Sequence, residues 1–323
     1  MEPEITAGEI AKPAVIVSER KRFAALAGPK TAVGRQQERL GWLLVLPSLI
    51  VVFAVAIYPL YETFRLSFTN TRLASAREVQ NVGWENYRRL LEDDQWWTAM
   101  RNTLIFTVSS VALEAILGMV VALTIHSQFK GRGLVRTSML VPWAIPTVVS
   151  SLLWSWMLHD RYGVINSIAI RLGLMDEGRN FAWVANTSTS LMAVVAIDVW
   201  KTTPFMALLI LAGLQIIPGD VYEASYVDGA SKWQQFWQIT LPLVKPALLV
   251  ALIFRTMDSF RVFDLIYVLK QGATDTMTVA IYTQQVLIQS SRLGAGSAAA
   301  VVIFVCIGLM VLGYSRLITV EEG

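Results

Sequence analysis

Long apolar stretches alternate with shorter polar segments along this chain. A helix needs about 20 mostly apolar residues to cross the hydrocarbon core of a bilayer. Six stretches meet that requirement: Trp42–Phe64, Thr103–His126, Thr137–Leu158, Leu191–Gly213, Ala247–Leu269 and Ala298–Leu317. Prolines and glycines inside them do not exclude membrane helices, which tolerate both. The pattern therefore predicts an all-α membrane protein with six transmembrane helices.

Composition supports this interpretation. Apolar residues make up 54% of the chain and charged residues 16%, with a mean hydropathy of +0.51, whereas soluble domains carry about 25% charged residues. The net charge of +3 is small and spread along the chain, so it does not indicate a nucleic-acid-binding protein. The single cysteine, Cys306, lies in an apolar stretch and is interpreted as a small core residue.

Basic residues predict the orientation. The short segment between the second and third stretches carries Lys130, Arg132 and Arg136 and no acidic residue. Because short cytoplasmic loops of membrane proteins are enriched in Lys and Arg, this loop is expected in the cytoplasm. Six helices then place both termini, and residues 215–246, on the cytoplasmic side. Residues 1–40 are expected to form a flexible cytoplasmic tail, and residues 41–319 one six-helix domain.

One polar segment, Tyr222–Pro242, separates the fourth apolar stretch from the fifth. Asp220 is a possible N-cap for a short helix ending near Val227, and Gly229 can adopt the positive φ of a turn. Ser231 can then cap a second helix that returns to the membrane. Composition alone leaves two alternatives open, an ordinary solvated loop or a short helix-turn-helix that presents acidic residues to a partner.

The residues of this segment match a known motif. Glu223 and Ala224 are followed at fixed spacing by Gly229, and then by Ile239, Leu241 and Pro242. The segment resembles the EAA loop of carbohydrate ABC importer permeases, whose motif is E-A-A-x(3)-G-x(9)-I-x-L-P. Ser225, in place of the second alanine, is the one departure within the loop.

The resemblance covers roughly residues 42–318. It includes Asn86-Tyr87, Arg101-Asn-Thr103, Pro142-Trp-Ala-Ile-Pro146, Trp200-Lys201, Pro204-Phe205, Phe263-Asp264, Thr278 and Tyr282. Within the family, the overall pattern is most similar to the first permease of trehalose-type disaccharide importers. Gln271-Gly-Ala273 departs from the Gly-Gly-Pro of many relatives, and this difference is expected to alter the outer turn near the solute entrance.

The resemblance implies a type I ABC importer architecture in the bacterial inner (plasma) membrane. It implies several partners: a second permease subunit, two ATP-binding subunits or domains, an extracytoplasmic sugar-binding lipoprotein, a carbohydrate substrate and membrane lipid. ATP and Mg would be bound by the partner ATPase, and this chain would hold no cofactor and catalyse no reaction itself. Contact with the ATPase would be made by Glu223, Ala224, Ser225, Asp228, Gly229 and Ala230.

Several ionisable residues lie within or near the apolar stretches. Each costs about 2.5–3.5 kcal/mol at the bilayer centre, so these residues are expected to face a cavity or one another. Asp198 and Lys201 can pair at a spacing of three. A second set recurs every three residues with alternating sign and predicts a ladder around helix five: Arg255, Asp258, Arg261 and Asp264.

Two roles remain open for these residues. They line a solute path, in which aromatic faces and hydrogen-bonding groups contact a sugar, or they only hold helices together. The predicted pathway residues are Trp200, Lys201, Thr202, Arg255, Asp258, Phe260, Arg261, Phe263 and Asp264. Glu114 stands alone in the second stretch and is predicted to have a structural role.

Catalytic and nucleotide-binding motifs are absent from the sequence. The chain has no G-x-x-x-x-G-K-[ST], no H-E-x-x-H and no C-x-x-C. Its two histidines, His126 and His159, are interpreted as residues at helix ends rather than metal ligands. The alternatives to a transport subunit are a stand-alone secondary transporter, for which no inverted repeat is evident, and a membrane-embedded glycan enzyme.

Overall fold

The computed structural model describes residues 32–73, 78–176 and 181–319, which form helices and connecting segments with a single isolated β-bridge between Thr69 and Asn81. The chain divides into two compact units, Met1–Glu62 and Thr63–Gly323. Helix α2 (Ala32–Val52) is followed by the π-turn η1 (Phe53–Ile57) and by α3 (Tyr58–Ser67), and the first unit ends within α3.

The predicted tail is partly wrong, because α2 begins at Ala32 and residues 32–40 are therefore helical. Residues 1–31 lie outside the described residues. For residues 1–31, the flexible tail stays a prediction.

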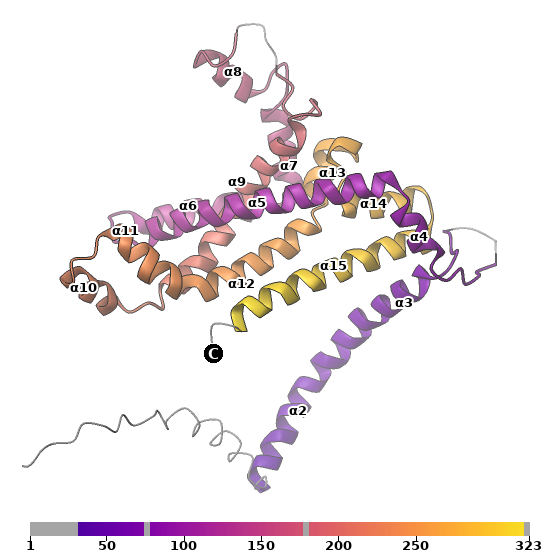
Figure 1. Ribbon diagram of the computed structural model, residues 1–323, viewed down its shortest axis with the longest axis horizontal. Helices are drawn as coiled ribbons and strands as arrows, with labels where there is room; N and C mark the ends of the chain where they lie inside the picture. Colours follow the sequence, from indigo (N-terminus) through magenta and orange to yellow (C-terminus); the bar gives the residue numbers. More distant parts are fainter. Residues whose placement is uncertain (1–31, 74–77, 177–180, 320–323) are drawn as a thin grey trace, which may run out of the picture. The chain divides into compact units, whose positions relative to one another are not determined.

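The second unit contains the remaining helices (Figure 1). Its long helices are α5 (Asp94–His126), α9 (Ser190–Leu214), α12 (Leu241–Phe260) and α15 (Leu293–Thr319). Its shorter elements are α4 (Glu85–Leu91), α6 (Arg132–Ala144), α7 (Thr147–Met157), α8 (Val164–Arg171), α10 (Gly219–Val227), α11 (Lys232–Gln235), η2 (Phe236–Thr240), α13 (Asp264–Lys270), η3 (Thr274–Thr276), α14 (Val279–Gln284) and η4 (Gln285–Gln289).

Helices α5, α9 and α12 pack on one another and form the centre of this unit (Figure 1). Small residues allow close approach, as in many membrane helix pairs. A Cβ added at Gly118 of α5 would lie 2.7 Å from Met206 Cγ, and one added at Gly213 of α9 would lie 2.4 Å from Ala247 Cβ. Larger residues at either glycine would therefore push these helices apart.

Two apolar clusters form the core along these helices. The first surrounds Phe106 and Phe260, and the second surrounds Met119 and Met206. Helices α5, α9 and α12 each contribute residues to both clusters. The residues between the two clusters therefore lie side by side on these three helices. Buried charged residues occupy the positions between the clusters.

Apolar helices long enough to cross a membrane number five among the described residues, or six if the bent pair α6–α7 counts as one span. This agrees with the predicted positions, but three details differ. Asp93 caps α5, so this helix begins nine residues before Thr103. The third stretch is two helices meeting at 91°. The fifth is interrupted between Phe260 and Asp264.

The polar segment before α5 is held by side-chain hydrogen bonds. Asn86 donates to the carbonyl oxygens of Ser67 and Thr69, 2.8 Å away in both cases. Tyr282 of α14 donates to Asp93 at 2.7 Å. Burial raises the pKa of the Tyr282 phenol above its ordinary range, and so does this hydrogen bond. Trp96 packs edge-on against Tyr282 and is fully buried, so it is a core residue.

Candidate functional site

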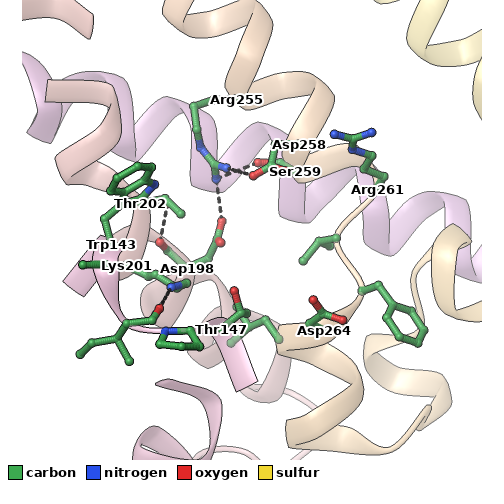
Figure 2. A pocket seen from close by; sticks show the side chains of 16 residues that line it. Trp143, Thr147, Asp198, Lys201, Thr202, Arg255, Asp258, Ser259, Arg261 and Asp264 are labelled. Carbon is green, nitrogen blue, oxygen red and sulfur yellow. Dashed lines mark hydrogen bonds and ion pairs between the residues drawn. The ribbon is translucent and has the colours of Figure 1, made fainter. Parts of the chain in front are cut away.

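A polar cavity of about 490 Å³ opens where two of the helical stretches are interrupted. One wall is the bend between α6 and α7, and another is the break between α12 and α13. Residues of α9 complete it. In Figure 2, Trp143, Lys201 and Thr202 lie on one side of the cavity, with Arg261 and Asp264 on the other.

The bend between α6 and α7 follows from Pro146. A proline disfavours the helical conformation of the residue before it, and Ile145 is extended, with ψ 131°. The freed carbonyl oxygen of Ile145 accepts a hydrogen bond from Lys201 Nζ at 2.5 Å. Irregular backbone at membrane depth is tolerated where such partners exist or where it borders a cavity.

The break after α12 also has its backbone satisfied. Thr278 donates from its hydroxyl to the carbonyl oxygen of Val262 at 3.0 Å. The carbonyl oxygen of Val262 therefore has a hydrogen-bond partner although residues 261–263 are not helical. This arrangement places their side chains on the cavity wall.

Arg255 of α12 is the centre of the charge cluster beside the cavity. Its guanidinium binds both carboxylate oxygens of Glu114, at 2.5 and 2.8 Å. It also binds Asp198 at 3.0 Å, Asp258 at 2.7 Å and the Ser259 hydroxyl at 3.0 Å. The Arg255 side chain is 2% exposed and that of Glu114 is fully buried. This bidentate, water-excluded geometry is the kind in which a buried ion pair is favourable.

The contacts differ from two expectations about these charges, although the structural role expected for Glu114 agrees with its burial. Glu114 is not alone, because it binds Arg255 and also accepts from Thr202 Oγ1. Asp198 and Lys201 do not pair with each other: Asp198 binds Arg255, and Lys201 binds the Ile145 carbonyl. Each of these two side chains instead binds a group on another helical element.

The predicted ladder is also wrong in its geometry. Arg255 and Asp258 do pair on α12. That helix ends at Phe260, however, so Arg261 lies in the break and Asp264 begins the next helix. The four residues therefore do not wind around a single helix, although all four border the cavity.

Most of the predicted pathway residues come together at this cavity. They are Lys201, Thr202, Arg255, Asp258, Arg261, Phe263 and Asp264. Two others do not line it: Phe260 is buried in the apolar core, and Trp200 packs edge-on against Trp154. The structure adds Asp198 and Ser259, together with Trp143, Ile145, Pro146 and Thr147 from the bend.

Sequence reasoning missed the bend residues for an identifiable reason. A proline can lie inside a membrane helix, as Pro142 does in α6, whereas Pro146 lies at the end of a helix. The Ile-Pro dipeptide was the signal that could have located the cavity wall, because the residue before proline is expected to be extended.

The chemistry of this cavity suits binding of a neutral polyhydroxylated solute. Its lining contains three carboxylates and three cationic side chains, which balance in formal charge, together with the rings of Trp143 and Phe263. Charged and polar groups can donate and accept hydrogen bonds to hydroxyls, and aromatic faces can cover apolar surface. Among the described residues, no group of three or more His, Cys, Asp or Glu side chains could hold a metal ion.

The segment after α9 forms a second candidate site. Helix α10 begins at Gly219, with Pro218 as its N-cap, so Asp220 lies in the first turn and is not the cap that the sequence predicted. Gly229 has φ +78°, as predicted. The Ala230 N–H bonds to the Ser225 carbonyl and the Gly229 N–H to the Tyr226 carbonyl, the pattern of a Schellman motif.

The return from this turn is also specified locally. Ser231 caps α11 in a capping box with Gln234, as the sequence predicted for the cap. Helix α11 then runs through the π-turn η2 into α12 without a break at Pro242 or Pro246.

Ser225, the residue that departs from the family motif, is buried and joins the two short helices. Its hydroxyl donates to the Tyr222 carbonyl at 2.8 Å and accepts from Gln235 Nε2 at 2.9 Å. An alanine could make neither bond. The predicted contact residues Glu223, Ala224, Asp228 and Gly229 are exposed and Ala230 is half-buried.

Large apolar side chains beside them are exposed as well, with Tyr226 at 78% and Val227 at 85%. Exposed apolar groups on an otherwise polar segment are typical of a surface that contacts another protein.

Comparison with known proteins gives a family match. The model of the family described as "Binding-protein-dependent transport system inner membrane component" matches residues 114–319, which is more than half of the chain. The matched region includes α9, α12 and the segment between them.

Two relatives match over nearly their whole length. The chain is 38% identical over 302 residues to the trehalose transport system permease protein SugA of Mycobacterium tuberculosis, covering 94% of this chain and 96% of that protein. It is 42% identical over 276 residues to the trehalose/maltose transport system permease protein MalF of Thermococcus litoralis, covering 84% and 91%.

A solved structure has the same fold. The chain resembles a bacterial ABC transporter involved in the import of the acidic polysaccharide alginate, with a TM-score of 0.75 and 24% identity. The match covers 87% of this chain and 96% of that chain.

Proposed function

Because this chain belongs to the family of binding-protein-dependent transport system inner membrane components, we propose that it is the permease subunit of an ATP-driven sugar importer. The observation that carries this proposal is the cavity of about 490 Å³, lined by polar and aromatic side chains, between apolar helices long enough to span a membrane. Broken helices around a polar site at membrane depth are a recurring feature of transport proteins.

The proposed solute is trehalose or a related disaccharide. The two relatives reported above are named for trehalose and for trehalose and maltose. A neutral sugar suits a cavity whose carboxylates and cations balance. The solute would be delivered by an extracytoplasmic binding protein, and a second permease would complete the path.

The proposed contact with the ATPase is the exposed surface of α10 and the turn after it. Glu223, Ala224, Asp228, Gly229 and Ala230 would lie at the contact, with Ser225 holding α10 against α11 from behind. ATP and Mg would be bound by the partner, since the sequence contains no phosphate-binding loop. Closure of the ATPase would then move α10 and, through α11, the long helix that carries Arg255.

A transport assay tests the assignment of the cavity. The substitutions Asp258→Asn and Arg261→Gln change two lining residues that lie outside the buried core. Each is expected to lower uptake of radiolabelled trehalose at least about tenfold in proteoliposomes holding the assembled importer, which corresponds to about 1.4 kcal/mol in binding or barrier. Arg171→Gln, at an exposed position on α8, serves as the control and is expected to transport normally.

Normal uptake and normal apparent affinity in both cavity variants would show that these residues only hold helices together. Loss of uptake together with loss of membrane insertion would count against the solute path as well, because a solute-contacting role requires a normally assembled variant. Neither a secondary transporter nor a glycan enzyme is favoured by a specific observation.

A further inference from the structure

A second polar cavity, of about 600 Å³, lies beside α10 and α11 and is not used by the proposed solute path. Its walls come from the end of α5, the beginning of α6, the end of α9 and the helix pair α10–α11. The polar residues that matter most are His126, Arg132, Arg136, Tyr222, Lys232 and Gln235.

The charge of this cavity is one-sided. Arg132, Arg136 and Lys232 line it, and its lining contains no acidic residue. Within the described part of the chain, no carboxylate forms an ion pair with any of the three. All three side chains are exposed, so a ligand from outside can reach them. Three uncompensated cations around one cavity favour an anion.

The beginning of α6 lies at this cavity, with Arg132 and Arg136 in its lining. Gly131, its N-cap, has φ +90° and no side chain caps the helix. The N-terminal end of a helix carries partial positive charge, which is compatible with a nearby anion. Helix α6 has 13 residues. Arg132 and Arg136 belong to the first two turns of α6.

The depth of the cavity follows from the helices that meet there. One span ends at His126 and another ends at Leu214, while the bent pair begins at Arg132 and a further span begins at Lys232. Apolar spans begin and end at the membrane surface, where phospholipid phosphates lie. Since candidate spans end at His126 and Leu214 and the bent pair begins at Arg132, the cavity is expected near the headgroups.

The surroundings provide an apolar contact as well. Leu123, Ile125 and Leu211 belong to the cavity lining. A free phosphate would use only the cationic groups, whereas a phospholipid would use both the cations and this apolar surface.

We propose that this cavity binds the phosphate-bearing headgroup of an anionic phospholipid, held by Arg132, Arg136 and Lys232. Basic pockets between membrane helices at the headgroup level are known to suit such lipids. The site is independent of the transported solute. Because it touches Tyr222 and Gln235, a bound lipid would stabilise the position of α10 relative to α5 and α6.

Native mass spectrometry of the assembled importer tests this proposal. The purified complex is mixed with equal amounts of phosphatidylglycerol and phosphatidylcholine of the same acyl chains, and the retained lipids are counted. Wild type is expected to retain phosphatidylglycerol preferentially. The double variant Arg132→Gln/Arg136→Gln should lower that preference about thirtyfold, equivalent to about 2 kcal/mol at 1.4 kcal/mol per tenfold.

Two matched variants separate binding from folding. Arg132→Lys/Arg136→Lys keeps the charge and is expected to keep most of the preference. Arg316→Gln removes a cation at the end of α15, another helix long enough to span the membrane, and is expected to change nothing. Millimolar inorganic phosphate is then added as a competitor.

Each contrary result has a definite meaning. Equal retention of the two lipids by wild type would overturn the proposal, and so would an unchanged preference in the glutamine variant. Complete displacement by inorganic phosphate would show that free phosphate rather than lipid is the ligand, which also overturns it. Loss of preference in Arg316→Gln would reduce the effect to general surface charge and reject the site.

Discussion

Arg255 shows how a single side chain connects three helices. It binds Glu114 on α5, Asp198 on α9 and Asp258 on its own helix. The sequence indicated that these ionisable residues must avoid lipid, because isolated charges are costly there. It could not indicate the partners, since a partner is chosen by the distance between helices and not by spacing along one helix.

The buried pairs of Arg255 should contribute more to stability than its pair with the exposed Asp258. Arg255→Gln leaves Glu114 and Asp198 buried without a cation, and breaking a buried pair in this way costs about 3–5 kcal/mol. The free energy of unfolding in mixed micelles, measured by detergent titration, is expected to fall by that amount.

The matched control is Asp258→Asn, which removes a carboxylate from the same guanidinium. The Asp258 side chain is 63% exposed, so its pair with Arg255 should contribute about 1 kcal/mol or less. Equal losses of stability in the two variants would contradict the assignment of Arg255 and Glu114 as the buried pair.

At the scale of elements, the interruptions in the helices determine where the cavity lies. Ile145 and Pro146 end α6 by a mechanism visible in the sequence. The break at Arg261–Phe263 contains neither proline nor glycine, so no local signal marks it. Thr278, from a later loop, satisfies the Val262 carbonyl that this break frees.

The turn after α10 was predicted correctly because its signals are local. Gly229 takes the positive φ that a Cβ would strain, and Ser231 caps the helix that follows. The start of α10 was misplaced by two residues, since Pro218, not Asp220, precedes the first helical residue.

Replacing Gly229 should test whether this turn transmits ATPase closure. Gly229→Val imposes about 1–2 kcal/mol of backbone strain at a left-handed position. Trehalose-stimulated ATP hydrolysis by the assembled importer is expected to fall several-fold while membrane insertion stays normal, because α10 would no longer be held in the geometry of the contact.

Gly173 provides the matched control. It has φ +68° and no atom within 4 Å of an added Cβ, so Gly173→Val carries a similar backbone strain after α8. If both valine variants lower trehalose-stimulated hydrolysis equally, the effect is one of general stability, and the role of α10 in coupling is rejected.

At the scale of the whole molecule, the alternation of apolar and polar segments gives the number and order of the spans. The side of the membrane on which each loop lies still depends on the basic residues Lys130, Arg132 and Arg136. That orientation, with both termini in the cytoplasm, stays a prediction.

Cysteine labelling checks the orientation. The chain has one cysteine, so Cys306→Ala gives a background without thiols. In intact cells, a membrane-impermeant maleimide is expected to label Ser188→Cys, in the exposed loop before α9, and to leave Ser231→Cys unlabelled until the membrane is opened. The reverse pattern would invert the predicted topology and place α10 on the outer side, where it could not meet an ATPase.

The sequence by itself determined the spans, the short helix pair that carries Glu223 and Gly229, and the set of ionisable residues that must avoid lipid. Those features depend on hydrophobicity, turn chemistry and capping, which act within about 20 residues. Only the tertiary structure decided that Arg255 pairs with Glu114, that Lys201 satisfies the bend at Ile145, and that Phe260 packs in the core while Phe263 borders the cavity. These outcomes depend on which helices pack together, because the low dielectric between packed helices makes a charge or a free carbonyl costly unless a neighbouring element supplies its partner.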